Sequence, residues 1–275
     1  DLLTIFIGIE LASGPMFLLS GWRKGDPKSN EGAIKFFLLG VLSAALILYG
    51  FSLLYGATGK IIFSEIVSTL SALGLHQSPV VLLSAILVLA GIGFKISVVP
   101  FHSWAPDTYE GAPLPITAYL SVSSKATGFL ALIILFTKVF YESGGSWGII
   151  LVLISGITMF IGNLSALQQK NPIRLLAYSS IAQAGFILAP IAVAGITGNY
   201  KDGVYSSITY LIIYAFMNLG AFLVVNILIN ATGSENIYEW GGLAKNSPMA
   251  GIFAVIFFFS LAGIPPLGGW FAKFV

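Results

Sequence analysis

The sequence has no cysteine, only two histidines and few charged residues. The lack of cysteine in 275 residues excludes disulfide bonds, thiolate metal sites and cysteine nucleophiles. Charged residues make up 9% of the chain, whereas a soluble domain carries about 25%. With two histidines and no cysteine, we expect no metal site and no redox cofactor held by side chains. The net charge of +2 is too small to indicate nucleic-acid binding.

The chain is instead dominated by long apolar runs. It is 57% hydrophobic, its mean hydropathy is +0.93, and a soluble fold of this length cannot bury so much apolar surface. Crossing the hydrocarbon core takes about 20 residues in a helix. Eight segments qualify, namely residues 2–21, 33–55, 79–101, 115–140, 147–168, 173–196, 204–230 and 248–275. None alternates with a period of two, so the sequence predicts an all-α, polytopic transmembrane helix bundle.

The connections between these segments are short and polar. Residues 60–76 and 235–246 are too polar to span the bilayer and are predicted to lie at its interface. Lys and Arg are twice as frequent in the first, third, fifth and seventh loops as in the others, so these loops are predicted to face the cytoplasm. Because the chain begins and ends inside apolar runs, we expect it to be an internal portion of a longer protein.

Five charged residues lie within the apolar runs. They are Glu10, Lys35, Lys95, Lys125 and Lys273. A charge at the bilayer centre costs about 2.5–3.5 kcal/mol on insertion scales, so the default interpretation is a path for an ion or a proton. Lys35 and Lys95 have a second interpretation, in which a lysine near a helix end extends its amine to the headgroups. For Glu10 the alternative is a protonated carboxyl that is hydrogen-bonded to a neighbouring helix.

Two of the apolar runs contain helix-breaking residues. Pro100 follows Lys95, and the adjacent Pro265 and Pro266 precede Lys273. Proline lacks an N–H group and clashes with the preceding turn, so both helices are predicted to break. Broken helices in two corresponding positions indicate internal repeats around a transport path.

Other polar residues in the runs have two interpretations each. One helix carries a polar stripe at intervals of four, formed by Ser206, Tyr210, Tyr214 and Asn218. The stripe could consist of interhelical hydrogen-bonding groups or be the wall of a hydrated proton channel. The same two interpretations apply to Asn163, Tyr178, Ser179, Ser180 and Gln183. His102 is either an interfacial side chain or a proton relay. Asp107 and Glu110 could pair with a basic loop of a partner subunit, although the sequence does not show one. No phosphate-binding loop, metal-ligand cluster or catalytic triad is present, so any energy source must lie elsewhere.

Four stretches resemble the antiporter-like membrane subunits of respiratory complex I. The most specific is Pro-Phe-His-Ser-Trp-Ala-Pro-Asp-Thr-Tyr-Glu-Gly-Ala-Pro at residues 100–113, which is similar to the family's broken helix. Residues 123–126, 174–185 and 259–274 match as well. Within the family, the residues of this motif and the lysine at position 125 are most similar to those of subunit N of NADH–quinone oxidoreductase, the counterpart of mitochondrial and chloroplast subunit 2.

The resemblance implies a division into two antiporter-like halves. Residues 1–140 correspond to family helices 5–8 and residues 141–275 to helices 9–12, arranged as inverted repeats. The charged residues then match the functional groups of the family as follows: Glu10 on the fifth helix, Lys35 on the sixth, Lys95 on the broken seventh, Lys125 on the eighth and Lys273 on the twelfth.

The resemblance also implies a function. The chain is expected to translocate protons in complex I, with Glu10 and Lys95 as a switchable pair, Lys125 as the relay and Lys273 as the exit. It would carry no redox chemistry itself, because FMN, iron–sulfur clusters and quinone belong to other subunits. Expected partners are neighbouring antiporter-like subunits, small membrane subunits and the lipid of an energy-transducing membrane, most simply a bacterial or archaeal plasma membrane. Alternatives are a Mrp-type Na⁺/H⁺ antiporter subunit, a hydrogenase or ferredoxin-linked complex, and a structural scaffold.

Overall fold

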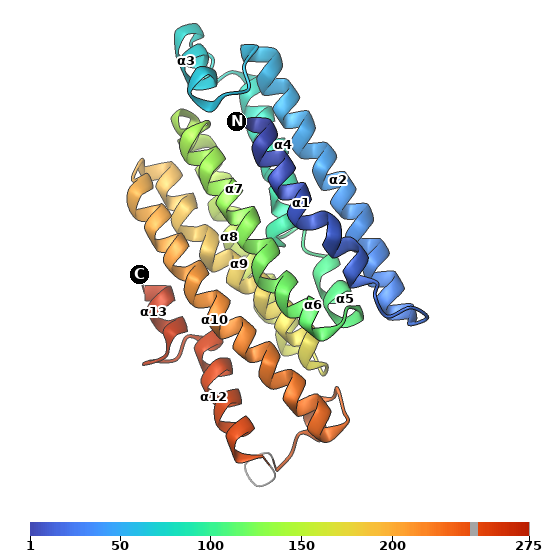
Figure 1. The fold of residues 1–275 in the computed structure, drawn as a ribbon. Helices are drawn as coiled ribbons and strands as arrows, with labels where there is room; N and C mark the ends of the chain where they lie inside the picture. The colour runs from blue at the N-terminus through green and yellow to red at the C-terminus, as the bar shows by residue number, and fades with distance from the viewer. Residues whose placement is uncertain (243–246, 275) are drawn as a thin grey trace.

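The computed structural model describes residues 1–242 and 247–274, and every regular element in this part of the chain is helical (Figure 1). The first half contains α1 Leu2–Ser20, α2 Pro27–Thr58, α3 Phe63–Leu73, α4 Pro79–Ile96, α5 Trp104–Gly111, α6 Leu114–Tyr119, η1 Leu120–Ser124 and α7 Lys125–Lys138. The second half contains η2 Tyr141–Ser143, α8 Gly144–Leu167, α9 Pro172–Thr197, α10 Tyr200–Thr232, η3 Ile237–Glu239, α12 Pro248–Ala262 and α13 Gly268–Phe274.

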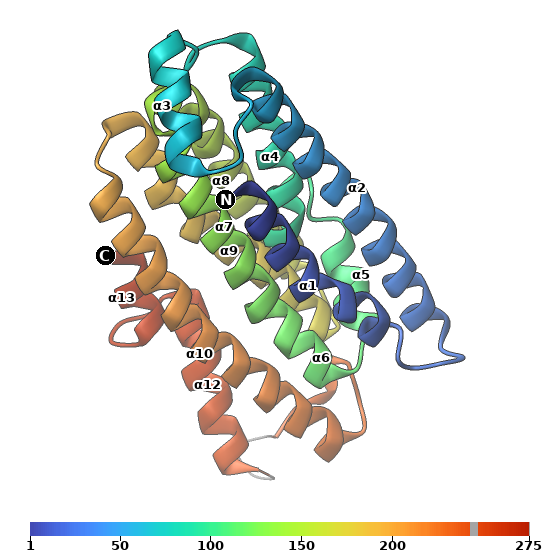
Figure 2. The same cartoon turned by 45° about the horizontal axis from the view of Figure 1, so that its top comes forward.

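The long helices form one bundle whose outer surface is apolar (Figure 2). Among the described residues, seven helices are long and apolar enough to cross a membrane. Large side chains such as Leu18 and Phe216 are 80% and 75% exposed, as expected for residues that face lipid rather than water. The predicted fold class, an all-α transmembrane bundle with broken helices, is therefore confirmed.

The eighth predicted span, residues 248–275, is divided into α12 and α13, and neither is long enough to cross the bilayer alone. Residues 60–76 do form a separate amphipathic helix, α3, which lies at one end of the bundle (Figure 1). Of the predicted interfacial segment 235–246, the structure describes a short 3₁₀ turn, η3, while residues 243–246 lie outside the described residues.

Both broken helices end in the same way. Ser97 after α4 and Gly263 after α12 adopt left-handed backbone conformations, with φ of 59° and 86°. In each case the cap N–H bonds to the carbonyls three and four residues earlier, and the next N–H bonds to the carbonyl five residues earlier. This is the hydrogen-bonding pattern of a Schellman cap, which satisfies the last carbonyls of a helix. Pro100 and the pair Pro265–Pro266 follow these caps and prevent the helix from continuing.

The two breaks also have similar surroundings. The 32-residue helix α2 packs against both α4 and α5, and the 33-residue helix α10 packs against both α12 and α13. In each half a long, unbroken helix thus bridges the two pieces of a broken one.

Consecutive loops alternate between the two ends of the bundle, as predicted. At one end, Lys170 and Asn171 hydrogen-bond to Ile237 and Glu235, which joins the fifth loop to the seventh. At the other end, the Tyr200 hydroxyl donates to the carbonyl of Tyr141 at 2.7 Å. Which end faces the cytoplasm stays a prediction.

Candidate functional site

Glu10 and Lys95 form an ion pair between the middle of α1 and the last turn of α4. Glu10 Oε1 lies 3.1 Å from Lys95 Nζ, which also donates to the Ser13 hydroxyl at 2.9 Å. The Lys95 side chain is 2% exposed and that of Glu10 is 27% exposed. The rings of Phe17 and Phe94 lie 5.6 and 5.8 Å from the same ammonium group. A carboxylate this close compensates part of the cost of burying the charge of Lys95.

The break beside this pair is held from two sides. The Val99 N–H donates to Thr158 Oγ1 of α8 at 3.0 Å, and Trp104 Nε1 of α5 donates to the Phe94 carbonyl at 3.1 Å. Polar backbone groups at membrane depth therefore have partners within the protein, which is the condition for a stable helix break in a bilayer.

Lys125 is buried at the start of α7 and bonds to α9. Its Nζ donates to the Ser180 carbonyl at 2.5 Å and to the Ser180 hydroxyl at 2.9 Å, and the side chain is 1% exposed. In the part of the chain that the structure describes, it has no carboxylate partner. The turn before it, η1, is a π-helix, a local distortion that is frequent at functional sites.

Glycine brings Lys95 and Lys125 onto closely packed helices. Gly128, one turn after Lys125, faces α4 at the level of Lys95. A Cβ atom on Gly128 would lie 2.7 Å from Ile96 Cγ2 and 3.2 Å from Lys95 Cβ, so a larger residue would push α7 away from α4. No direct hydrogen bond joins the two lysines among the described residues.

Three residues of the polar stripe on α10, namely Tyr210, Tyr214 and Asn218, are buried and bond to two other elements. Tyr214 donates to the Ser121 carbonyl at 3.0 Å, and Asn218 Nδ2 donates to Ser121 Oγ at 2.6 Å. Tyr210 donates to Gln183 Oε1 on α9 in a short hydrogen bond. These contacts fit the interhelical hydrogen-bonding interpretation, and a proton-carrying role for the stripe stays a prediction.

Lys273 lies on α13 and reaches back across the second break. Its Nζ donates to the carbonyls of Leu261 and Ala262 at 3.3 and 3.0 Å. Gln183 Nε2 donates to the same Leu261 carbonyl at 2.8 Å. A continuous series of polar contacts therefore links four helices. It runs from Tyr210 on α10 to Gln183 on α9, and from there through the Leu261 carbonyl of α12 to Lys273 on α13.

The remaining predicted residues lie apart from this series. Lys35 is 42% exposed and pairs with Asp107 and Glu31, both at 2.6 Å. His102 lies half-buried in the turn between α4 and α5, and the Tyr178 hydroxyl makes no hydrogen bond among the described residues.

The sequence and the structure were compared with known proteins. The family model described as "NADH:quinone oxidoreductase/Mrp antiporter, TM" matches residues 1–275.

The chain belongs to the NADH:quinone oxidoreductase/Mrp antiporter family.

Curated relatives within this family are subunits of quinone oxidoreductases. The chain is 45% identical to NADH-quinone oxidoreductase subunit N of Desulfitobacterium hafniense, with 100% of this chain and 57% of the relative covered. It is 44% identical to NAD(P)H-quinone oxidoreductase subunit 2 of Microcystis aeruginosa, with 99% and 52% covered. The chain thus spans about half the length of the curated relatives it matches.

Solved structures of family members share the fold. Respiratory complex I from Thermus thermophilus with bound aureothin contains a chain of 34% identity and TM-score 0.79, with 99% of this chain and 57% of that chain covered. The Mrp complex from Dietzia sp. DQ12-45-1b contains one of 26% identity and TM-score 0.86, with 100% and 50% covered. These likenesses and the seven candidate spans identify a multi-pass membrane protein of the family.

The sequence did not reveal which polar groups contact Lys95, Lys125 and the first helix break. Ser13 lies three residues after Glu10, so the helical spacing could have revealed that both face Lys95. Ser180 and Thr158 gave no such signal, because they reach Lys125 and Val99 across 55 and 59 residues of chain. Only tertiary packing selects them from the other hydroxyl groups of α8 and α9.

A cluster of six charged residues ties α5 to the ends of α2 and α9. It consists of Lys28, Glu31, Lys35, Asp107, Glu110 and Arg174. Arg174 Nη1 lies 2.8 Å from both Asp107 and Glu110, and Lys28 lies 2.6 Å from Glu110. Asp107 and Glu110 thus pair with basic residues of this chain, and their suggested pairing with a partner subunit stays a prediction. Burial alone would raise the pKa of Asp107, but hydrogen bonds from Lys35 and Arg174 outweigh burial and hold it below its usual value. The pKa of Glu110 is lowered in the same way by Lys28 and Arg174.

Replacing Arg174 with glutamine is expected to destabilise the fold by about 1–3 kcal/mol at neutral pH, between the values for exposed and buried ion pairs. Because the folded state lowers both carboxyl pKa values, the pairs stabilise it fully above the unfolded-state values of about 4. This stabilisation is lost as the pH falls through the lower, folded-state values. Thermal unfolding of the full-length protein in detergent should therefore show a deficit at pH 7 that shrinks below pH ~4. Arg23→Gln, in the exposed first loop, is the control, and an equal deficit in both variants would contradict the prediction.

Proposed function

We propose that this chain is part of a proton-translocating membrane-arm subunit of an NADH–quinone oxidoreductase. The observation that carries the proposal is the series of cationic side chains that runs through the bundle, two of them buried and the third, Lys273, half-buried. Lys95, Lys125 and Lys273 each lie on a different helix, and each bonds to polar groups of a neighbouring helix or break. Buried lysines with this arrangement are costly and are typical of proton pathways.

In this proposal, the Glu10–Lys95 pair is the switch. With the carboxylate at 3.1 Å, Lys95 holds its proton. When α1 moves away or the carboxylate is neutralised, desolvation favours the neutral amine, and Lys95 releases a proton. The exposure of Glu10 on α1 gives the neighbouring subunit or the solvent a route to influence it.

Lys125 is the relay in mid-membrane. Burial without a carboxylate favours its neutral amine, while the Ser180 carbonyl and hydroxyl favour its ammonium form. These opposing effects allow it to accept a proton from the Lys95 side and to release it again. The polar side chains of α9 and α10, ending in Gln183 and the Leu261 carbonyl, lead from there to Lys273.

Each broken helix has both of its pieces packed against one long helix, α2 in the first case and α10 in the second. This similarity supports two antiporter-like halves, residues 1–140 and 141–275. In the complete complex, the redox chemistry of FMN, iron–sulfur clusters and quinone would take place in other subunits. The partners would be the neighbouring antiporter-like subunits and the small membrane subunits of the membrane arm. The membrane would be an energy-transducing plasma membrane.

A second candidate is a subunit of a Mrp-type Na⁺/H⁺ antiporter or of another respiratory membrane complex. The TM-scores of 0.86 for the Dietzia Mrp complex and 0.86 for the archaeal membrane-bound sulfane sulfur reductase, to which the chain is 25% identical, are higher than the 0.79 for the complex I chain. The relatives of highest identity that we describe are quinone oxidoreductase subunits, which favours the first candidate.

The test uses the native complex in proteoliposomes with NADH and quinone, and follows luminal pH and ²²Na⁺ uptake. Proton accumulation that needs NADH and no sodium is expected. Replacing Glu10 with glutamine keeps the shape of the side chain but removes the switch, so protons translocated per electron should fall several-fold while the complex still assembles. Undiminished pumping in this variant would contradict the switch, and sodium exchange without NADH would favour the Mrp-type antiporter.

A further inference from the structure

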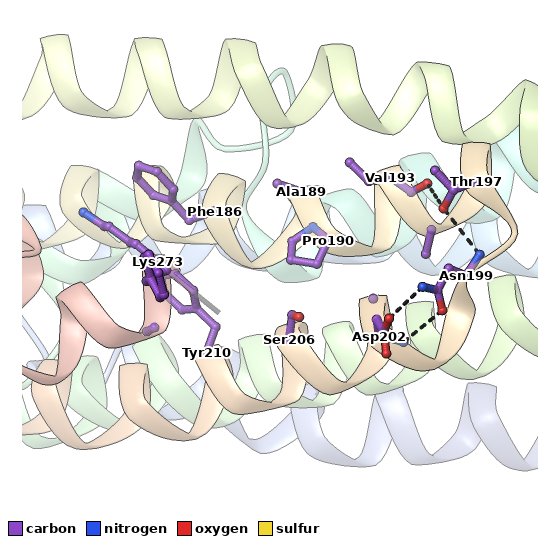
Figure 3. A pocket seen from close by; sticks show the side chains of 14 residues that line it. Phe186, Ala189, Pro190, Val193, Thr197, Asn199, Asp202, Ser206, Tyr210 and Lys273 are labelled. Atoms are coloured by element: carbon purple, nitrogen blue, oxygen red, sulfur yellow. Dashed lines mark hydrogen bonds between the residues drawn. The ribbon is translucent and has the colours of Figure 1, made fainter.

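Two cavities meet at Lys273 and extend toward opposite ends of the bundle. The first, of about 420 Å³, runs between α9 and α10 from Lys273 past Ser206 to Asp202 (Figure 3). The second, of about 580 Å³, lies between α8, α9 and α12 and runs from Lys273 to Leu175 in the first turn of α9. We call them the Asp202 cavity and the Leu175 cavity. Because Asp202 follows the far end of α9, the two cavities together extend along most of that helix.

Of the described residues, only Phe186 and Lys273 line both cavities. Lys273 Nζ lies 4.5 Å from the centroid of the Phe186 ring, within the range of a cation–π contact. On the Asp202 side, the Phe186 ring stacks on Tyr210 at 6.3 Å with an interplanar angle of 8°. Figure 3 shows these three side chains together at one end of the cavity. The aromatic ring therefore lies where the two cavities meet, and the lysine amine lies over its face.

The Phe186 side chain has space to move, and the helix that carries it can bend at this point. Phe186 is half-buried, and free volume lies on both sides of its ring. Pro190, four residues later, has no N–H to donate to the Phe186 carbonyl, so α9 lacks one backbone hydrogen bond at this point. A missing bond of this kind is a common cause of local bending in a helix.

We propose that Phe186 is the gate that gives Lys273 access to one cavity at a time, an inference that rests on the proposed proton-translocating function. In one position of the ring, the neutral amine of Lys273 accepts a proton from the Leu175 side, where Gln183 shares the Leu261 carbonyl with it. In the other position, the ammonium group releases that proton toward the Asp202 cavity and returns to the neutral amine. One proton enters and one leaves, so the lysine is regenerated. Phe186 itself carries no proton and acts as a positioning residue.

If Phe186 is the gate, removing its ring should cause a proton leak. Phe186→Ala joins the two cavities, so Lys273 exchanges protons with both and the resting complex leaks. We expect passive proton flux under a potassium diffusion potential, without NADH, to rise about thirtyfold, the factor that corresponds to one desolvated cation–π contact of about 2 kcal/mol. The flux is read from a luminal pH dye in proteoliposomes that contain the whole complex. Phe257→Ala is the control, because this half-buried ring on α12 lines neither cavity.

Two further variants make the test decisive. Adding Lys273→Met to Phe186→Ala should remove the leak, since the lysine is the group that carries the proton; a leak that persists overturns the proposal. Phe186→Leu preserves an apolar side chain for helix packing but removes the ring that contacts Lys273, so it should also leak, and it decides the matter if the alanine variant does not assemble. Assembled Phe186 variants without a leak also overturn the gate. Because NADH-driven pumping by the native complex is measured in the same vesicles, failure of the gate is distinguishable from failure of the proposed function.

Discussion

Replacing Lys125 with methionine is expected to abolish NADH-driven proton translocation through this chain. Methionine keeps the apolar stem of the side chain in its fully buried site but removes the amine that bonds to Ser180 of α9. The Ser180 carbonyl and hydroxyl then face a thioether that can neither give nor take a proton. We expect translocation through this chain to fall at least tenfold, because losing a positioned proton-transfer group costs about 10²–10⁴-fold in rate.

The measurement is luminal acidification per NADH oxidised in proteoliposomes that contain the complete complex. Lys138→Met is the matched control, because Lys138 lies on the same helix and is exposed at its end. The control should pump normally. Equal pumping by the Lys125 variant and the control would show that Lys125 is a structural residue.

Replacing Gly269 with alanine is expected to prevent the second broken helix from forming. A Cβ atom on Gly269 would lie 1.7 Å from the carbonyl oxygen of Ser260, so α13 could not remain against α12. The Gly269 N–H also donates to Ser260 Oγ at 3.0 Å, and this bond would be lost with the displacement. Overpacking costs typically about 1–3 kcal/mol, and a clash with backbone belongs at or above the upper end. Because α13 carries Lys273, proton translocation should be lost together with stability.

The neighbouring glycine provides a close control. A Cβ on Gly268 would have its nearest contact at 3.3 Å, with Ile213 Cγ2, a contact that a small side-chain shift relieves. Both substitutions gain the same helix propensity, so a comparison of the two isolates the clash. Assembly yield and thermal unfolding of the complex should be near normal for Gly268→Ala and strongly reduced for Gly269→Ala. Similar values for both would mean that the close approach of α13 to α12 is not required.

The helical bundle and the two breaks could be predicted because their causes are local in sequence. An apolar run of about 20 residues has few alternatives to a membrane-spanning helix, since its backbone must satisfy its own hydrogen bonds in lipid. Proline lacks an N–H group and clashes with the preceding turn, so Pro100 and Pro265–Pro266 indicated the two breaks from the sequence. The rule is not absolute, because α1 and α9 continue through Pro15 and Pro190. The division of residues 248–275 into two helices follows from the same chemistry.

The partners of the charged residues could not be predicted in the same way. Lys35 shares the apolar context of the other lysines, yet its partners Glu31 and Asp107 place it in an ion-pair cluster at one end of the bundle. Glu31, four residues before Lys35, is a local signal that Lys95 lacks. Asp107, however, comes from a segment 72 residues away, so the sequence could not reveal the cluster as a whole. Similarly, no local pattern indicates that Phe186 separates two cavities at Lys273.

The sequence by itself determined the class of protein, the family resemblance and the five intramembrane or near-membrane charges, because the cost of a charge in lipid makes each one visible against its apolar neighbours. The tertiary structure decided which of them belong together. Glu10 forms an ion pair with Lys95, and Lys125 hydrogen-bonds to Ser180. Lys273 hydrogen-bonds to the carbonyls at the second break, and Lys35 belongs to the ion-pair cluster at one end of the bundle. The physical reason is that such contacts join helices far apart in the chain, and their choice depends on the packing of the whole bundle.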